Sequence, residues 1–142
     1  WLRIEGKRVV FTNGCFDILH VGHIVYLEQA KALGDLLVVG LNSDQSVQKL
    51  KGPQRPIQNQ EDRKKILLSL RSVDFVEIFD QATPEQLIHA VKPHVLVKGG
   101  DWPIEKIVGG SFVQSYGGQV KSLAFVPGRS TSSIVEKIIH TT

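Results

Sequence analysis

The feature of this sequence that most restricts its fold is a regular alternation of short, β-rich apolar runs with segments of helical periodicity. The apolar runs cover residues 8–12, 36–41, 75–78, 95–98 and 120–125. Several are apolar at consecutive positions, which is typical of parallel strands covered on both faces. Helices are predicted at 23–33, 61–70, 83–92 and 132–140. This order predicts an α/β fold with a doubly wound, mostly parallel five-stranded sheet.

Local signals refine the ends of these elements. Gly34 is a good stop for the helix at 23–33. Thr83 is predicted as the N-cap of the next-to-last helix, with Pro84 at its first position. Residues 49–56, which are basic and rich in Pro and Gly, are predicted to form a loop insertion. Ligands of such folds bind beyond the carboxyl ends of the strands, so we expect the polar motifs to meet there.

Length and composition narrow the class of protein. The 142 residues are enough for one domain, predicted as residues 1–142, with its own core. No apolar run approaches the roughly 20 residues that span a bilayer, and no signal peptide is evident, so no membrane association is expected. The single cysteine, Cys15, fits a reducing compartment, and we expect a cytoplasmic location.

The charge pattern favours a small anionic substrate. The net charge is only +3, and no basic stripe with interleaved aromatic residues is present, so nucleic acid is not an expected partner. The chain has no methionine and begins with tryptophan. We therefore expect it to be trimmed or to be one piece of a longer polypeptide.

One motif follows the first predicted strand directly. A glycine turn, Asn13-Gly14-Cys15-Phe16-Asp17, leads to a helix start that carries His20, Gly22 and His23. Backbone N–H groups and the helix dipole, worth about half a charge, make such a helix start an anion site. The two histidines are spaced i, i+3 and share one face, and Gly22 lets a phosphate approach the backbone. The pair is predicted to donate hydrogen bonds to phosphate oxygens, most strongly in the transition state.

Other interpretations of this motif are open at the level of sequence. A P-loop and a dinucleotide fingerprint are both absent. A zinc site at the histidines is disfavoured because no third ligand stands at metal-site spacing. Asp17 is interpreted first as the N-cap of the following helix, with orientation of a histidine as the alternative. Cys15 is interpreted as a packed residue and not as a nucleophile.

The motif resembles the GxFDxxHxGH pattern of the cytidylyltransferase-like nucleotidyltransferase superfamily. The resemblance runs from about residue 8 to 139 and continues through Glu61-Asp62-Arg63, residues 97–102 and residues 128–134. Within the superfamily the motif sequences are most similar to those of the adenylyltransferase domains of ADP-heptose synthases, which share Leu-Lys-Gly-Pro, Val-Lys-Gly-Gly-Asp-Trp and Gly-Arg-Ser-Thr-Ser. The resemblance implies a Rossmann-like nucleotidyltransferase fold.

The resemblance also implies a reaction. AMP would pass from ATP to heptose 1-phosphate, giving ADP-heptose for lipopolysaccharide core synthesis and releasing pyrophosphate. Mg²⁺ would arrive with ATP, with no dedicated protein cage. A homo-oligomer and fusion to a sugar kinase domain are further implications. The alternatives are a CTP-dependent cytidylyltransferase acting on glycerol 3-phosphate or a similar alcohol phosphate, and a nucleotide-binding regulatory module without turnover.

Residue roles follow from the motif and the resemblance together. The catalytic residues are expected to be His20, His23, Lys49 and Lys51. The residues expected to bind the nucleotide are Asn13, Gly14, Phe16, Gly22, Lys98, Gly99, Asp101, Trp102, Arg129, Ser130, Thr131 and Ser132. The residues expected to bind the second substrate are Asp17, Arg55 and Arg63.

Some of these residues have a purely structural alternative. The cations at 49, 51 and 55 are alternatively a solvated charge cluster. Arg63 is alternatively paired with a carboxylate on its own helix, and Trp102 is alternatively a core residue.

Overall fold

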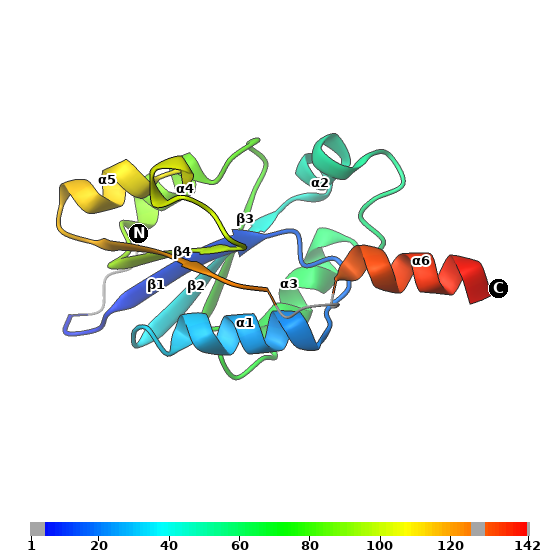
Figure 1. Cartoon of the computed structure of the whole chain (residues 1–142), viewed down its shortest axis with the longest axis horizontal. Helices are drawn as coiled ribbons and strands as arrows, with labels where there is room; N and C mark the ends of the chain where they lie inside the picture. Colours follow the sequence, from blue (N-terminus) through cyan, green and yellow to red (C-terminus); the bar gives the residue numbers. More distant parts are fainter. Residues whose placement is uncertain (1–4, 126–129, 142) are drawn as a thin grey trace.

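The computed structural model describes residues 5–125 and 130–141 and has a central parallel sheet (Figure 1). Its strands are β1 (Val9–Gly14), β2 (Leu36–Asn42), β3 (Phe75–Phe79), β4 (Val95–Gly99) and β5 (Gln119–Leu123). They lie in the order β3-β2-β1-β4-β5, and each neighbouring pair is parallel. The predicted doubly wound α/β fold is confirmed, and the sheet is parallel throughout.

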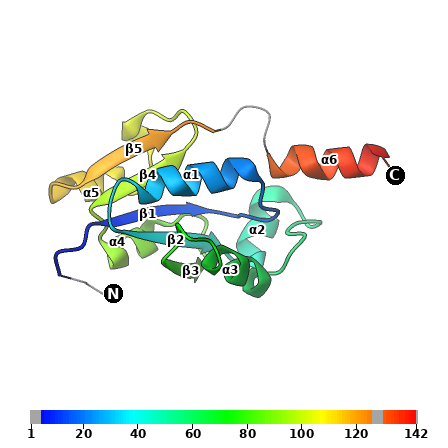
Figure 2. The same ribbon diagram turned by 90° about the horizontal axis from the view of Figure 1, so that it is seen from below.

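Helices cover both faces of the sheet (Figure 2). They are α1 (Val21–Lys31), α2 (Asp44–Lys51), α3 (Gln60–Leu68), α4 (Glu85–Val91), α5 (Gly110–Ser115) and α6 (Thr131–Thr141), with a 3-10 turn at Ile104–Lys106. Successive strand residues point to opposite faces. Val10 therefore packs with Leu27 of α1 and Leu67 of α3, whereas Phe11 packs with Ile88 of α4.

Two helices were not predicted from the sequence. The helix α2 begins at the N-cap Ser43 and contains Lys49 and Lys51, so the prediction of a loop over 49–56 is wrong for its first three residues. Its eight residues include only two apolar ones, Val47 and Leu50, which are too few to reveal a helical repeat in the sequence. The helix α5 has six residues, fewer than two turns, and is likewise too short to show a period.

The predicted start of α4 is also corrected. Pro84, not Thr83, occupies the N-cap position, and no side chain caps this helix by a hydrogen bond. Thr83 instead lines a cavity of about 550 Å³. The cap prediction failed because a Thr-Pro-Glu string indicates that a helix begins nearby but does not fix its first residue to within one position.

The topology fixes where a ligand can enter. The chain leaves β1 toward β2 on one side and returns to β4 on the other, so the winding reverses beside β1. A crevice opens at the carboxyl ends of strands at such a point. The helix α6 projects from this end of the molecule (Figure 1). In the described ranges, no helix has the length and apolar character that crossing a bilayer requires.

Candidate active site

A cavity of about 550 Å³ lies at the carboxyl ends of β1 and β4. Its walls come from the β1–α1 loop, the end of α2, the end of β4 and the start of α6. The structure brings together many of the predicted site residues here. These are Asn13, Gly14, Phe16, Asp17, His20, Gly22, His23, Lys51, Arg55, Lys98, Gly99, Ser130, Thr131 and Ser132.

The two motif histidines cap their own helix. His20 is the N-cap of α1, with extended backbone angles, and its Nδ1 accepts a hydrogen bond from the Gly22 amide at 3.1 Å. His23 reaches back so that its Nδ1 accepts from the His20 amide at 3.3 Å. The arrangement is a capping box in which imidazoles replace the usual hydroxyl and carboxylate. The predicted shared face is confirmed, since the rings stack with centroids 3.9 Å apart.

This cap fixes the protons of the two rings. A neutral imidazole whose Nδ1 accepts a hydrogen bond carries its proton on Nε2. Burial, assisted by the nearby His20, lowers the pKa of His23 from 6.5 to about 4. His23 is therefore neutral at pH 7, with an N–H donor at Nε2. Both rings line the cavity, so the motif presents donors to an anion there.

Phe16 packs against the histidine pair and the end of β1. Its φ of 45° is in the left-handed region that L residues seldom adopt. In that conformation its ring meets His23 edge-on, with centroids 5.2 Å apart. The ring also lies against Gly14, where an added Cβ would approach it to 2.8 Å. The predicted glycine turn is thus required by close packing of an aromatic ring against the end of β1.

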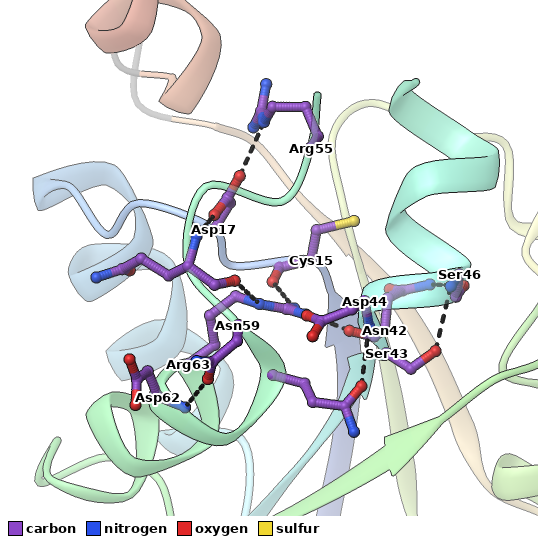
Figure 3. Close-up of polar contacts among 12 residues, drawn as sticks. Cys15, Asp17, Asn42, Ser43, Asp44, Ser46, Arg55, Asn59, Asp62 and Arg63 are labelled. Atoms are coloured by element: carbon purple, nitrogen blue, oxygen red, sulfur yellow. Dashed lines mark hydrogen bonds and ion pairs between the residues drawn. The ribbon is translucent and has the colours of Figure 1, made fainter. Parts of the chain in front are cut away.

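The interpretation of Asp17 as a helix cap is wrong, because His20 has that role. The Asp17 carboxylate is 1% exposed and accepts a hydrogen bond from Arg55 (Figure 3). It also accepts from the backbone amides of Ile57 and Gln58. Burial alone would raise the pKa of this carboxyl, but the two backbone donors and Arg55 outweigh it and hold the pKa below its usual value. Asp17 is therefore an ionised anchor for the segment at 55–58.

Arg63 lies behind the cavity and does not line it. Its side chain is fully buried and donates to the carbonyl oxygens of Cys15, Asn42 and Gln58 at 2.7–2.9 Å. It also pairs with Asp44 of α2 at 2.7 Å, not with a carboxylate of its own helix (Figure 3). This position does not fit the predicted substrate contact. Arg63 instead joins the β1–α1 loop, β2 and the start of α3.

The β4 side of the cavity differs in part from the prediction. Trp102 and Asp101 are exposed and do not line the cavity, although the ammonium of Lys98 lies 5.3 Å from the centre of the Trp102 ring. The aromatic side chain that lines this wall is Phe125, packed so closely on β4 that a Cβ at Gly99 would lie 2.8 Å from its ring.

The start of α6 closes the third wall. The Thr131 hydroxyl donates to the Ile18 carbonyl at 2.8 Å, which joins α6 to the β1–α1 loop across 113 positions of sequence. The hydroxyl groups of Ser130 and Ser133 share a short hydrogen bond. The predicted nucleotide contact of Arg129 lies outside the described residues. Lys49 is exposed on α2 and is not brought to the cavity, whereas Lys51 is.

Several lining residues were missed by sequence reasoning. They include Tyr26, Asn42, Leu50, Thr83, Val108 and Phe125. Tyr26 is buried, hydrogen-bonded to Thr12 at 2.5 Å, and burial raises its pKa to about 12 despite that bond. A signal existed for Asn42 alone, since it is a polar residue at the carboxyl end of a predicted strand.

The chemistry of the lining suits a polyanion. Lys51, Arg55 and Lys98 bring positive charge, and Asp17 is the only carboxylate among the described lining residues. Its charge is already matched by Arg55 at 2.8 Å. Burial raises the pKa of the Cys15 thiol, which keeps it protonated and unsuited to nucleophilic attack. Among the described residues, no group of three or more His, Cys, Asp or Glu is placed to hold a metal ion.

Fold and site together define an α/β protein with a largely cationic cleft at the switch point of a doubly wound sheet. A family model described as cytidylyltransferase-like matches residues 11–137. The chain therefore belongs to the cytidylyltransferase-like family, which confirms the resemblance inferred from the motifs.

Named relatives extend this comparison. The bifunctional protein HldE of Geobacter sulfurreducens is 56% identical over 137 residues, which is 96% of this chain and 28% of that protein. The bifunctional protein HldE of Geotalea uraniireducens is 57% identical, again over 96% of this chain and 28% of its own. The chain thus spans little more than a quarter of these relatives. A crystal structure of the lipopolysaccharide core biosynthesis protein from Thermoplasma volcanium matches 85% of this chain and 98% of its own, with a TM-score of 0.67 and 31% identity.

Proposed function

We propose that this chain transfers AMP from ATP to heptose 1-phosphate, releasing pyrophosphate and supplying ADP-heptose for the lipopolysaccharide core. The observation that carries the proposal is the pair of stacked imidazoles, each held by a backbone amide at Nδ1, at the start of α1. The similarity to a lipopolysaccharide core biosynthesis protein and to bifunctional HldE proteins supports a sugar phosphate as acceptor.

The reaction needs positioning more than covalent chemistry. A phosphate oxygen of the acceptor attacks the α-phosphorus of ATP in line, and the bond to the bridging oxygen of pyrophosphate breaks with its electrons. The Nε2–H groups of His20 and His23 donate to the oxygens that gain charge. Lys51, from the end of α2, lines the same cavity and neutralises phosphate charge there. No general base is needed, because the attacking phosphate oxygen is already an anion.

The nucleotide is proposed to lie between α1 and α6. Its phosphates meet the amides of the β1–α1 loop and the hydroxyl groups at the start of α6. Its base lies toward β4, beside Lys98 and the aromatic wall of Phe125. The residues proposed to line its path are Asn13, Gly14, Phe16, Gly22, Gly99, Ser130, Thr131 and Ser132. Arg129 is retained as a nucleotide ligand on the resemblance alone.

Mg²⁺ is proposed to enter bound to the nucleotide, because enzymes of this family generally use magnesium complexes of their nucleotides. The donor set fits this, because Asp17, the one lining carboxylate in the part of the chain that the structure describes, already accepts four hydrogen-bond contacts from residues 55–58. Phosphate oxygens and water would hold the ion, which would neutralise part of the phosphate charge. We further propose a cytoplasmic location, a homo-oligomer, and a sugar kinase domain in the same polypeptide as partner, as the word bifunctional in the relatives' names suggests.

Pyrophosphate release tests the proposal directly. The chain would be assayed with Mg-ATP or Mg-CTP, each combined with heptose 1-phosphate or glycerol 3-phosphate. We expect release with ATP and heptose 1-phosphate. Release only with CTP and glycerol 3-phosphate would favour the cytidylyltransferase alternative.

The histidines give the matching loss-of-function test. Replacing His20 or His23 by alanine removes one preorganised donor and is expected to lower kcat about 10²-fold or more. His140→Ala, an exposed histidine near the end of α6, is the control and should retain the rate. Equal rates for wild type and the two motif variants would mean that the chain is a nucleotide-binding module without turnover.

A further inference from the structure

The segment that connects α2 to α3 is fastened to the β1–α1 loop by one buried carboxylate. Asp17 accepts from Arg55 Nε at 2.8 Å and from the Gln58 amide at 3.0 Å. The Ile57 amide donates to both carboxylate oxygens, at 2.8 and 2.9 Å. All these donors lie 38–41 positions from Asp17 in sequence. Asp17 therefore places a distant segment, with its cation, against the loop that carries the motif.

Stability alone is a weak reason for such an arrangement. Burying an ion pair costs desolvation that its mutual attraction only roughly repays, and apolar side chains of similar size often do as well. What the pair does provide is a fixed geometry. Arg55 is held at one edge of its guanidinium group and cannot swing into solvent without leaving a buried carboxylate without its cation.

The rest of the guanidinium group faces the cavity. Arg55 is 14% exposed and lines the cavity together with Lys51. Its Nε is used by Asp17, and the terminal end of the group extends away from that carboxylate (Figure 3). Among the described residues, Asp17 is its only ion-pair partner. Two terminal nitrogens in a planar fork match the spacing of two phosphate oxygens.

The cations of the cavity are divided between two walls. Lys98 stands at the end of β4, whereas Lys51 and Arg55 stand at the end of α2 and in the connection that follows it. An in-line displacement needs the two anionic substrates on opposite sides of the reacting phosphorus. With the nucleotide between α1 and α6, the wall formed by α2 and its connection is left for the other anion.

We infer that Arg55, held by Asp17, binds the phosphate of the sugar-phosphate acceptor, and that Asp17 is a positioning residue that acts through Arg55. The inference rests on the proposed function, because it assigns the second substrate of that reaction to one wall of the cavity. It makes the ligand of this wall a phosphate monoester of a small polyol or sugar. The Arg55 fork orients the attacking oxygen toward the α-phosphorus.

Steady-state kinetics with each substrate varied separately tests the role of Arg55. Arg55→Gln is expected to raise KM for heptose 1-phosphate roughly 10- to 100-fold, the usual effect of losing a hydrogen-bonded charge. KM for Mg-ATP should stay within about threefold of wild type, because the nucleotide uses the other walls. Arg55→Lys, which keeps the charge without the fork, should give an intermediate KM.

The matched control is Arg8→Gln, which removes the same charge from an exposed position at the opposite end of β1. It should leave both KM values unchanged and so exclude a general effect of net charge. The inference is overturned if Arg55→Gln leaves KM for the acceptor unchanged, or raises both KM values alike.

Asp17→Asn tests the positioning role through its dependence on Arg55. Alone it should raise KM for the acceptor. In the Arg55→Gln background it should raise this KM by less than about a further threefold, because both changes remove the same interaction with the acceptor. Full additivity would overturn the positioning role. If Asp17→Asn does not fold, the kinetics of Arg55→Gln and Arg55→Lys decide whether Arg55 binds the acceptor.

Calorimetric titration with heptose 1-phosphate keeps this inference separable from the proposed function. Wild type that binds the sugar phosphate but releases no pyrophosphate contradicts the proposed function only. Wild type that turns over while Arg55→Gln binds the sugar phosphate equally well contradicts the Arg55 inference only.

Discussion

At the scale of single residues, the site depends on where two imidazole protons are held. The backbone amides of His20 and Gly22 donate to the two Nδ1 atoms, which places the proton of a neutral ring on Nε2. A neutral donor suits this task better than a cation, because it binds the ground-state phosphates less tightly and still stabilises charge that develops in the transition state.

His23 should leave a signature in the pH dependence of stability. Its pKa is lowered by burial from 6.5 to about 4 in the folded protein. Between these values the unfolded chain binds a proton that the folded protein does not, so the free energy of unfolding falls as pH drops from 6.5 toward 4. Urea unfolding at several pH values should show this slope in wild type and a smaller one in His23→Asn, whose amide oxygen can replace Nδ1 as acceptor.

The exposed His140 supplies the control for this measurement. His140→Asn should keep the wild-type slope, because the side chain of His140 is 73% exposed. The ionisation of Asp17 affects the free energy of unfolding at lower pH. Because the pKa of Asp17 is lowered in the folded protein, its contribution to stability is present above pH ~4 and is lost below it. Identical slopes for wild type and His23→Asn above pH 4.5 would contradict the assignment.

At the scale of elements, the sequence predicted what depends on neighbouring positions. All five strands lie within two residues of their predicted ends, and α1 was predicted with the motif at its start. The roles of Asp17 and Arg63 could not be predicted in the same way. Their partners lie up to 48 positions away, and no local pattern records which loop a buried charge will meet.

The buried Arg63 gives a prediction at this scale, because it joins three elements with one side chain. Arg63→Met keeps the volume but leaves three carbonyl oxygens and Asp44 without their donor. The expected loss of unfolding free energy is roughly 3 kcal/mol or more, as for breaking a buried charged network. Urea denaturation measures it.

Asp44→Asn is the comparison for this prediction, since the Asp44 side chain is 36% exposed and water can take its place. We expect a loss of about 1 kcal/mol or less from this change. Should Arg63→Met cost no more than Asp44→Asn, the carbonyl contacts of Arg63 would not be the source of its effect.

At the scale of the whole molecule, one wall of the cavity comes from a helix that the rest of the protein hardly covers. None of the residues of α6 is buried, although Ser130, Thr131 and Ser132 beside its start line the cavity. A helix without buried side chains opens easily, because its own hydrogen bonds give little stability in water. A ligand that touches both α1 and α6 would therefore stabilise the placement of α6.

Hydrogen exchange measured with and without Mg-ATP tests this coupling. At about ten times its Kd the nucleotide adds roughly 1.4 kcal/mol to the state that binds it, which corresponds to about tenfold slower exchange for amides that open only when it leaves. We expect this slowing in the first turns of α6, where the hydroxyl groups would meet the phosphates. Adenosine, which lacks phosphates, should leave exchange in α6 unchanged. If calorimetry shows that Mg-ATP binds while α6 exchanges at its original rate, the nucleotide does not reach this helix, and its phosphates must be held by the β1–α1 loop without α6.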